Sequence, residues 1–581
     1  RRQRQMCIRD SHAVVGMCAL GLIGLNSCLK VDETYDLDKD FDMTITVGGD
    51  LTVPGSSTEK IVLGDLLDLE DNSVIKVNNS AGDYYLVQDG ETSNTDVKVP
   101  GVDINMTDGF TKVEQTFNIP GGTGSDNPKD VEFKDNIAVD VNENGITSDI
   151  KSISNAETSC RNTYLVFSKN TDQIKAVLEN GYTIEFPNYI TVKSENADWT
   201  AEGNILKLTK AEGMEISNST KVKFQIVKVQ FDQNEAVFTN NENEKDNNSV
   251  HFGGNISLDG NVKASALTND GGNITLSANV EAENMVIESA TAVVDPEVDI
   301  TIDPIRIDDI PEFLSDNNVV LDLTDPRIYI TVTNPSPVAV NMNAALKSFK
   351  EGNAKGEAYL QDVNIPKECE NYVICVNQNK EGWNETDKIM YEKVEGLSDL
   401  IKNIPDRIEI TDVETSVVQE EVTIDLDKNY TIVTDYRVDT PLMFGPETNI
   451  TYTETIDGWD ADLEDMEFDR VEASMNVINE IPLGVKMTAK AIDVNGNVLE
   501  NVKVDMDVEI KAGEIGAPTT QNVKFTLTTD DGRIAGLDGI EISVVASVDN
   551  SVSDVTLNEN QTMQFTEIKL RLVGGITMDL N

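Results

Sequence analysis

Histidine is almost absent from this 581-residue sequence, in which it occurs only at positions 12 and 251. So few imidazoles exclude a histidine-rich zinc site and leave any Ser-His-Asp or Cys-His catalytic arrangement dependent on His251. The sequence also lacks a Gly-x-Ser-x-Gly nucleophile elbow and the glycine loops that bind nucleotides. These absences predict a protein that is not an enzyme.

Cysteine is also sparse, with six residues, three of which lie within the first 28 positions. Cys369 and Cys375 flank a five-residue segment, which suggests a local hairpin disulfide in an oxidising compartment. Two unpaired thiols are the alternative. Cys160 is left without a partner in either case.

Basic residues are few: 46 Lys and Arg stand against 103 Asp and Glu, a net charge of −57. Because nucleic acid is bound by neutralising its phosphates with Lys and Arg, we expect no nucleic-acid partner. The 39% of hydrophobic residues are spread along the chain and are sufficient for a folded core.

No apolar run is long enough to span a membrane, which takes roughly 17–25 residues. Residues 13–25 form an uncharged stretch of signal-peptide length that ends just before Ser27 and Cys28. This arrangement resembles a bacterial lipoprotein signal, which implies cleavage between Ser27 and Cys28 and acylation of Cys28. An ordinary secretory signal with an incidental cysteine is the alternative.

The resemblance predicts a mature protein held to the bilayer through the acylated Cys28, at the cell outer membrane. Residues 1–27 would be the signal peptide, although residues 1–11 hold four arginines and resemble translated adapter sequence. Residues 28–45 are rich in aspartate and are expected to form an acidic tether.

Alternation of apolar and polar residues dominates the rest of the chain. It is clear in 222–229 and 273–280, and turn dipeptides such as Asp259-Gly260 and Asn495-Gly496 separate such segments. This pattern predicts an all-β fold of tandem antiparallel, immunoglobulin-like sandwiches in an elongated array. Short connector helices are expected at 171–180 and at 397–404.

A short motif occurs twice at a constant offset of 145 residues, at 332–344 and at 477–489. Valine, asparagine, proline, methionine and alanine recur in it, and each copy predicts strand, turn and strand. The motif resembles the strand-turn-strand of late-embryogenesis-abundant (water-stress) β-sandwich domains. Four consecutive modules are therefore expected, the last repeating the third: 46–135, 136–250, 251–395 and 396–581.

Two kinds of ligand site are suggested by local patterns. Asp140, Asn142 and Asn144 precede a glycine as in a calcium loop, but the closing position holds a lysine, so an Asn-Gly turn is the alternative. Tryptophans beside polar residues suggest glycan contacts, with plugs at the ends of sandwiches as the alternative; the candidates are Trp383, Trp459, Asp457 and Asp460. No other cofactor is expected.

The leader, the acidic start and the sandwich pattern together resemble the all-β surface lipoproteins of the Bacteroidota, a resemblance that implies no activity. We expect a non-enzymatic envelope lipoprotein that binds an unknown ligand or has a structural role. The alternatives are a glycan-binding lipoprotein of a nutrient-uptake system and an accessory subunit of a fimbrial or envelope assembly.

Overall fold

The computed structural model describes residues 51–578 except for 55–56, 68, 70–72, 123–127, 161, 233, 243, 308–309, 311–318, 380–385, 458–465, 507, 531, 535, 549–551 and 553. In these residues nearly all regular structure is β-strand, and the helices are α2 (Leu63–Leu67) and α4 (Leu397–Ile401). The all-β, multi-sandwich prediction is confirmed. The immunoglobulin-like topology stays a prediction.

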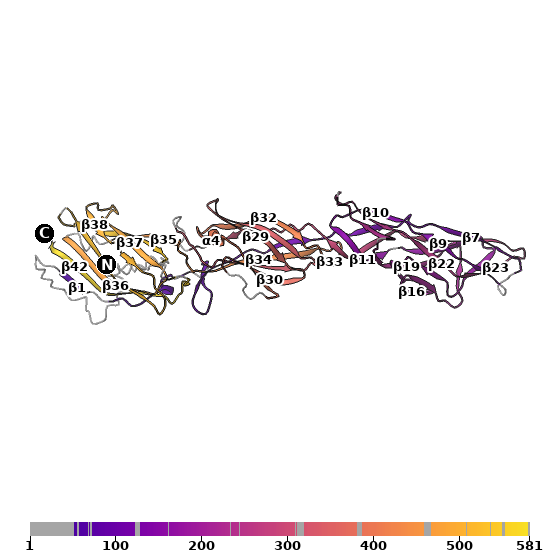
Figure 1. Ribbon diagram of the computed structural model, residues 1–581, viewed down its shortest axis with the longest axis horizontal. Helices are drawn as coiled ribbons and strands as arrows, with labels where there is room; N and C mark the ends of the chain where they lie inside the picture. Colours follow the sequence, from indigo (N-terminus) through magenta and orange to yellow (C-terminus); the bar gives the residue numbers. More distant parts are fainter. Residues whose placement is uncertain are drawn as a thin grey trace, which may run out of the picture.

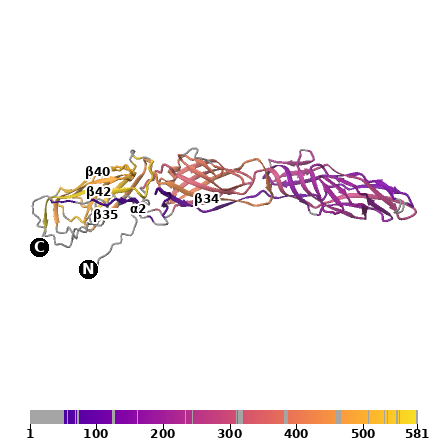
Figure 2. The same ribbon diagram turned by 90° about the horizontal axis from the view of Figure 1, so that it is seen from below.

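The strands form an elongated molecule with three bodies in a row (Figures 1 and 2). We call them the base module, which holds both β1 and β42, the middle module, and the distal module at the far end. Each is built from sheets whose strands pair antiparallel, and β30–β31 is the one parallel pair among the described strands.

The base module contains a six-stranded and a four-stranded sheet. The six-stranded sheet consists of β1 (Leu51–Pro54), β2 (Ile61–Val62), β42 (Thr562–Met578), β36 (Met466–Asn479), β40 (Thr519–Thr529) and β38 (Val502–Asp505). The four-stranded sheet consists of β35 (Asn449–Ile456), β41 (Gly539–Ser547), β37 (Gly484–Ile492) and β39 (Val508–Ile510).

The middle module contains a seven-stranded and a four-stranded sheet. The seven-stranded sheet consists of β3 (Ile75–Val77), β4 (Tyr84–Asp89), β5 (Ser93–Val97), β34 (Tyr430–Pro441), β27 (Arg327–Asn334), β30 (Cys369–Asn377) and β31 (Ile389–Lys393). The four-stranded sheet consists of β26 (Ile305–Arg306), β32 (Arg407–Val417), β28 (Val340–Lys350) and β29 (Asn353–Ile365).

The distal module is the largest and is built around a nine-stranded sheet: β33 (Glu421–Asp425), β25 (Asn284–Val294), β11 (Ile150–Cys160), β19 (Thr220–Gln230), β12 (Tyr164–Lys169), β24 (Gly272–Glu281), β7 (Val113–Ile119), β15 (Ile190–Ser194) and β6 (Val102–Asn105). Three smaller sheets complete it. The five-stranded sheet consists of β16 (Trp199–Glu202), β17 (Ile205–Leu208), β14 (Thr183–Glu185), β22 (Asn255–Asp259) and β9 (Asp135–Ala138), and the four-stranded sheet consists of β18 (Met214–Ile216), β13 (Ile174–Leu178), β23 (Asn261–Ala266) and β8 (Lys129–Glu132). The three-stranded sheet consists of β10 (Val141–Ile146), β21 (Asn248–Phe252) and β20 (Ala236–Thr239).

The chain passes through the modules and then returns, so the modules are nested. It leaves the base after α2, adds β3 to β5 to the middle module, and builds the distal module from β6 to β25. It then returns through the middle module to finish in the base, where Leu51 of β1 pairs with Leu572 of β42. On the way back, β33 leaves the middle module to pair with β25 of the distal module.

This nesting differs from the four consecutive modules expected from the sequence. The segment 251–395 was expected to be one module, but its strands β24 and β25 pair with β12 and β11 of the distal module, whereas β27 to β30 belong to the middle module. Alternation and turn signals identify strands locally, but they do not identify a partner hundreds of residues away.

The two copies of the sequence motif occupy equivalent places in the middle and base modules. Asn334 and Asn479 are fully buried. Nδ2 of Asn334 donates to the carbonyl oxygens of Val338 (2.9 Å) and Pro366 (3.0 Å). Nδ2 of Asn479 donates to those of Leu483 (3.3 Å) and Lys511 (2.9 Å), and every one of these acceptors is shifted by the same 145 residues. The buried amide therefore fixes the same crossing between two sheets in both modules.

The helix expected at 171–180 is a strand instead. Residues 174–178 form β13, which pairs with β18 and β23, and alternate residues Ile174, Ala176 and Leu178 are buried. The Thr171 hydroxyl, which would cap a helix, accepts from the Gln173 backbone N–H (3.1 Å) in a local turn. The helix expected at 397–404 forms as α4 over its first five residues.

Candidate functional site

The free end of the distal module is a cluster of loops. The described loop segments are 120–122 after β7, 170–173 after β12, 217–219 after β18 and 267–271 after β23. We call these loops, with the strand ends that lead into them, the tip. Since rigid sheets carry these loops at the end farthest from β1, the tip is our candidate binding surface (Figure 1).

Backbone contacts between the loops hold the tip together. The N–H of Leu267 donates to the carbonyl of Gln173 (2.8 Å), and the N–H of Lys169 donates to that of Ser217 (3.2 Å). A Cβ added at Gly121 would lie 1.9 Å from the carbonyl oxygen of Asn269, so only glycine permits the first loop to approach the last. These contacts hold the described loop segments of the tip to one another.

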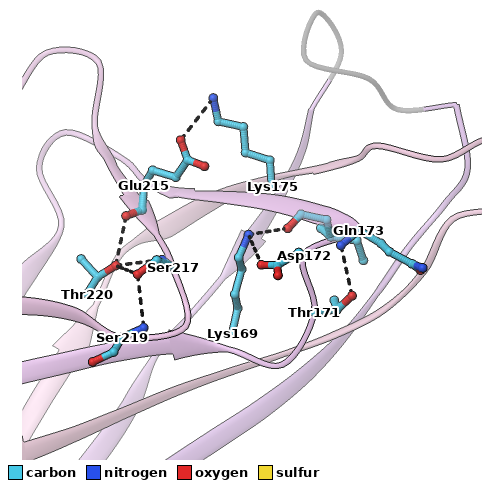
Figure 3. Close-up of polar contacts among 10 residues, drawn as sticks. Lys169, Thr171, Asp172, Gln173, Lys175, Glu215, Ser217, Ser219 and Thr220 are labelled. Carbon is cyan, nitrogen blue, oxygen red and sulfur yellow. Dashed lines mark hydrogen bonds and ion pairs between the residues drawn. The ribbon is translucent and has the colours of Figure 1, made fainter.

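Lysine and hydroxyl side chains reinforce two of the loops (Figure 3). The side chain of Lys169 is only 7% exposed, and its Nζ donates to the carbonyl of Ile174 (3.1 Å) and lies 3.8 Å from Asp172. The Thr220 hydroxyl accepts from the Ser217 N–H (2.8 Å) and closes the other loop. A buried lysine stem under one loop and a hydroxyl bridge under the other leave the outer faces available for contact.

The described part of the tip has one exposed large apolar side chain and an ion pair between two of its strands. Leu267 is 62% exposed, in a chain whose large apolar residues are otherwise mostly buried. Lys175 on β13 faces Glu215 on β18 at 3.5 Å, so that carboxylate is neutralised locally (Figure 3). This chemistry suits recognition of a ligand by contact.

A polar groove lies at the other end of the distal module, where it meets the middle module. Its lining includes Asn144, Asp149, Asp246 and Glu297. Burial raises the pKa of Asp149, whereas hydrogen bonds from the backbone and hydroxyl of Ser148 lower the pKa of Asp246. Within the described residues, no group of three or more His, Cys, Asp or Glu side chains is arranged to hold a metal ion.

The calcium candidates lie on a strand and not around a loop. Asn142 and Asn144 belong to β10, which pairs with β21, and Asp140 directly precedes it. Nδ2 of Asn142 donates to Oδ1 of Asp140 (2.9 Å), and Nε2 of His251 lies 3.3 Å from the same oxygen. Alternate residues of an extended strand lie in a row along one face, so Asn142 and Asn144 do not wrap around a cation as the residues of a ligand loop do.

The cysteine geometry corrects the predicted disulfide. Cys369 and Cys375 both lie in the single extended strand β30 and not on facing arms of a hairpin. Six residues of strand span about 20 Å, whereas a disulfide needs Cα atoms roughly 4.4–6.8 Å apart. Cys160 is buried, and burial raises the pKa of its thiol to about 11, which makes it unreactive.

Of the four glycan candidates, Asp457 alone lies in the described residues. Trp383, Trp459 and Asp460 lie outside the described residues, and Asp457 is exposed just after β35. Trp199 is a core residue at 3% exposure, with its indole N–H 3.5 Å from the sulfur of Met214. Ser27 and Cys28 also lie outside the described residues.

Sequence reasoning missed the tip, because its loops come from separate parts of the chain. The one local signal was the turn dipeptide Asp270-Gly271, where the glycine has a φ of 67°. Nothing in a single sequence indicates that this turn meets segments 120–122 and 170–173.

No protein-family model matches the chain, and no curated protein matches it. Among solved structures, it is similar to a Parabacteroides distasonis protein described as secreted, with 16% identity and a TM-score of 0.34, over 50% of this chain and 90% of that one. A structure of the triple jelly roll fold and turret assembly in an archaeal virus covers 82% of this chain and 91% of that one, at 9% identity and a TM-score of 0.07. Neither likeness is strong enough to carry an argument about function.

None of the helices in the described residues combines the length and the apolar character needed to cross a membrane.

Proposed function

We propose that this chain is a lipid-anchored protein of the bacterial outer membrane whose elongated body displays the tip for binding, without catalysis. One observation carries the proposal: β1, the first described strand, lies in the base module, at the end opposite the tip (Figures 1 and 2). An anchor on Cys28 precedes β1 in the chain, so it would hold the base near the bilayer and direct the tip away from it.

The nested path supports this role. Because the chain enters and leaves the distal module on its inner side, through β6, β25 and β33, every connection to the other modules lies at the end away from the tip. The tip loops are therefore unobstructed by linkers. A signal-sequence cysteine carrying acyl chains supplies roughly 0.8 kcal/mol per buried methylene, and several chains make the anchoring stable.

Replacing Cys28 tests the anchor. The wild-type chain should be recovered with outer membranes, and Cys28→Ala should be recovered in the soluble fraction, as measured by fractionation and immunoblotting. Cys369→Ala is the matched control, since it removes a thiol from the body and should leave the protein on the membrane. Full membrane retention of Cys28→Ala would refute the proposed anchor.

A further inference from the structure

The outgoing part of the chain adds strands to the largest sheet of each module, and each of them pairs antiparallel with a strand of the returning part. β1 and β2 pair with β42 in the base, β4 and β5 with β34 in the middle, and β6 with β25 in the distal module. The outgoing strands therefore run from the base towards the tip, and their partners run back towards the base. A pull on the N-terminal end, directed away from the tip, slides each outgoing strand lengthwise along its partner.

The first outgoing segment lies along β42 of the base module. We call the described residues of 51–67, which contain β1, β2 and α2, the strap. Leu51 pairs with Leu572 near the end of β42. Val62 pairs with Thr562, the first residue of β42. Figure 2 shows the strap in indigo beside β42 in yellow. The strap therefore begins at the outer end of the base module and ends at the junction with the middle module.

Hydrogen bonds and two core residues hold the strap in place. Between β1 and β2, the N–H of Thr58 donates to the carbonyl of Phe565 (2.8 Å), and the Thr58 hydroxyl accepts from the N–H of the same phenylalanine (3.1 Å). After β2, the N–H of Leu63 donates to the carbonyl of Gln561 (2.8 Å). Leu63 and Leu67 of α2 are buried in the core. The strap is therefore attached at several points along its length.

The direction of a pull decides how strongly such an attachment resists it. The hydrogen bonds of an antiparallel pair lie perpendicular to the strands, so a lengthwise pull loads all of them at the same time. A sideways pull at one end of the strand breaks them one after another. Tension between the N-terminal end and the tip is a lengthwise pull on the outgoing strands of all three modules.

We propose that the molecule bears tension between the membrane and the tip, and that the strap is the attachment that yields first. β1 and β2 have four and two residues, whereas β4 and β5 have six and five, so the strap has the shorter ladder of hydrogen bonds. Its release lengthens the molecule while the middle module stays folded. The inference rests on the proposed function, because an anchor at Cys28 sets the direction of the pull.

Pulling on single molecules of the full-length chain tests the strap, with Cys28→Ala to keep the protein free of lipid. Azidophenylalanine at position 50, just before β1, carries one DNA handle, and the same group in place of Tyr359, which is 55% exposed on β29 of the middle module, carries the other. The first event should lengthen the chain by at most about 85 Å, because residues 51–74 extend by no more than about 3.6 Å each. A longer first event would mean that a whole sheet unfolds before the strap yields, which would overturn the proposal.

The matched control changes only the direction of the pull, by moving the second handle to position 579, directly after β42. Both handles then adjoin the outer end of the base module, so the strap and β42 are peeled apart from one end. We expect this separation at a several-fold lower force than in the first geometry. Equal forces in the two geometries would overturn the proposal.

A removable crosslink identifies the strap as the source of the first event. Thr52 and Arg571 lie directly opposite each other in β1 and β42, at a separation that a disulfide can bridge. Once mass spectrometry shows the bridge, the variant Thr52→Cys/Arg571→Cys should lack the first event, and reductant should restore it. Persistence of the event in the oxidised variant would overturn the proposal. Fractionation of Cys28→Ala is independent of these measurements, so the anchor and the strap can fail separately.

Discussion

The middle and base modules are two versions of one sandwich, and comparing them shows which parts of it are held constant. In both, a buried asparagine ends one strand and fixes the crossing to the next, β27 to β28 in the middle and β36 to β37 in the base. Val340 pairs with Ile365 in one module and Val485 with Ile510 in the other, again 145 residues apart. The central strands are therefore equivalent in register as well as in order.

The edges of the two modules differ. At one edge β29 has 13 residues and its counterpart β39 has three. At another, β31 is parallel to β30, whereas β38 is antiparallel to β40. The outgoing chain supplies two short strands in line to both modules: β4 and β5 pair along β34, and β1 and β2 pair along β42. A constant core with variable edges is what stability requires, because the core carries most of the buried apolar area.

The largest effect is expected from breaking the shared turn. Asn334→Asp or Asn479→Asp replaces a buried donor by an acceptor, leaving buried carbonyl oxygens without their hydrogen bonds. We expect each variant to lose roughly 3–5 kcal/mol of stability. Hydrogen exchange followed by mass spectrometry should place the loss in the middle module for Asn334→Asp and in the base module for Asn479→Asp.

Asn341→Asp is the matched control for both variants. Its side chain only accepts a hydrogen bond from Asn364 at an exposed position, a role that aspartate retains, so its stability should stay close to wild type. Equal losses from the control and the buried variants would show that the added charge, and not the buried amide, determines the effect.

A smaller effect is expected at the junction of the two sandwiches, where Tyr84 is buried. Its backbone is bonded to Leu557 of the base module and to Leu442. Burial, with added repulsion from Glu559 and Asp65, raises the pKa of Tyr84 to about 12. The folded state therefore keeps its proton between pH 10 and pH 12 while the unfolded state loses it, so stability falls as the pH rises through that window.

A shift of about two pKa units corresponds to about 2.7 kcal/mol once the pH exceeds the folded pKa. Tyr84→Phe should remove this part of the alkaline destabilisation, as measured by denaturant unfolding of both proteins across the window. Burial also raises the pKa of Tyr329 and of two tyrosines in the distal module, and these groups are present in both proteins. The difference between the two slopes of unfolding free energy against pH therefore isolates the contribution of Tyr84. Equal slopes for the wild type and Tyr84→Phe would contradict this prediction and would mean that the junction opens before Tyr84 ionises.

The strands of both sandwiches were predictable from the sequence, whereas their partners were not. Strands such as β19 and β24 alternate over most of their length because one face is buried, and that period is visible in a short stretch of sequence. The pairing of β1 with β42 joins residues about five hundred positions apart, and no local signal records it. The tip was missed for the same reason, since its loops meet only after the sheets have formed.

The error at β13 shows how a correct local signal can be assigned to the wrong element. Thr171 does accept the hydrogen bond expected of a capping residue, and Gly181 does have a positive φ of 93°. Both features serve turns around a strand, because the flanking strands β18 and β23 offer hydrogen bonds along its whole length. Tertiary pairing thus decides between helix and strand where local propensity is balanced.

The smallest effect is expected from the thiols that distinguish the two modules. Strand β30 of the middle module carries Cys369 and Cys375, and its counterpart β40 carries no cysteine. Since both thiols lie on one extended strand, reduction should leave the melting of the full chain unchanged, as measured by calorimetry with and without reductant. Loss of a native disulfide typically costs about 2–5 kcal/mol, so a melting temperature that falls on reduction would contradict the single-strand geometry. Cys369→Ala is the control, because it cannot form the bridge and must melt identically in both conditions.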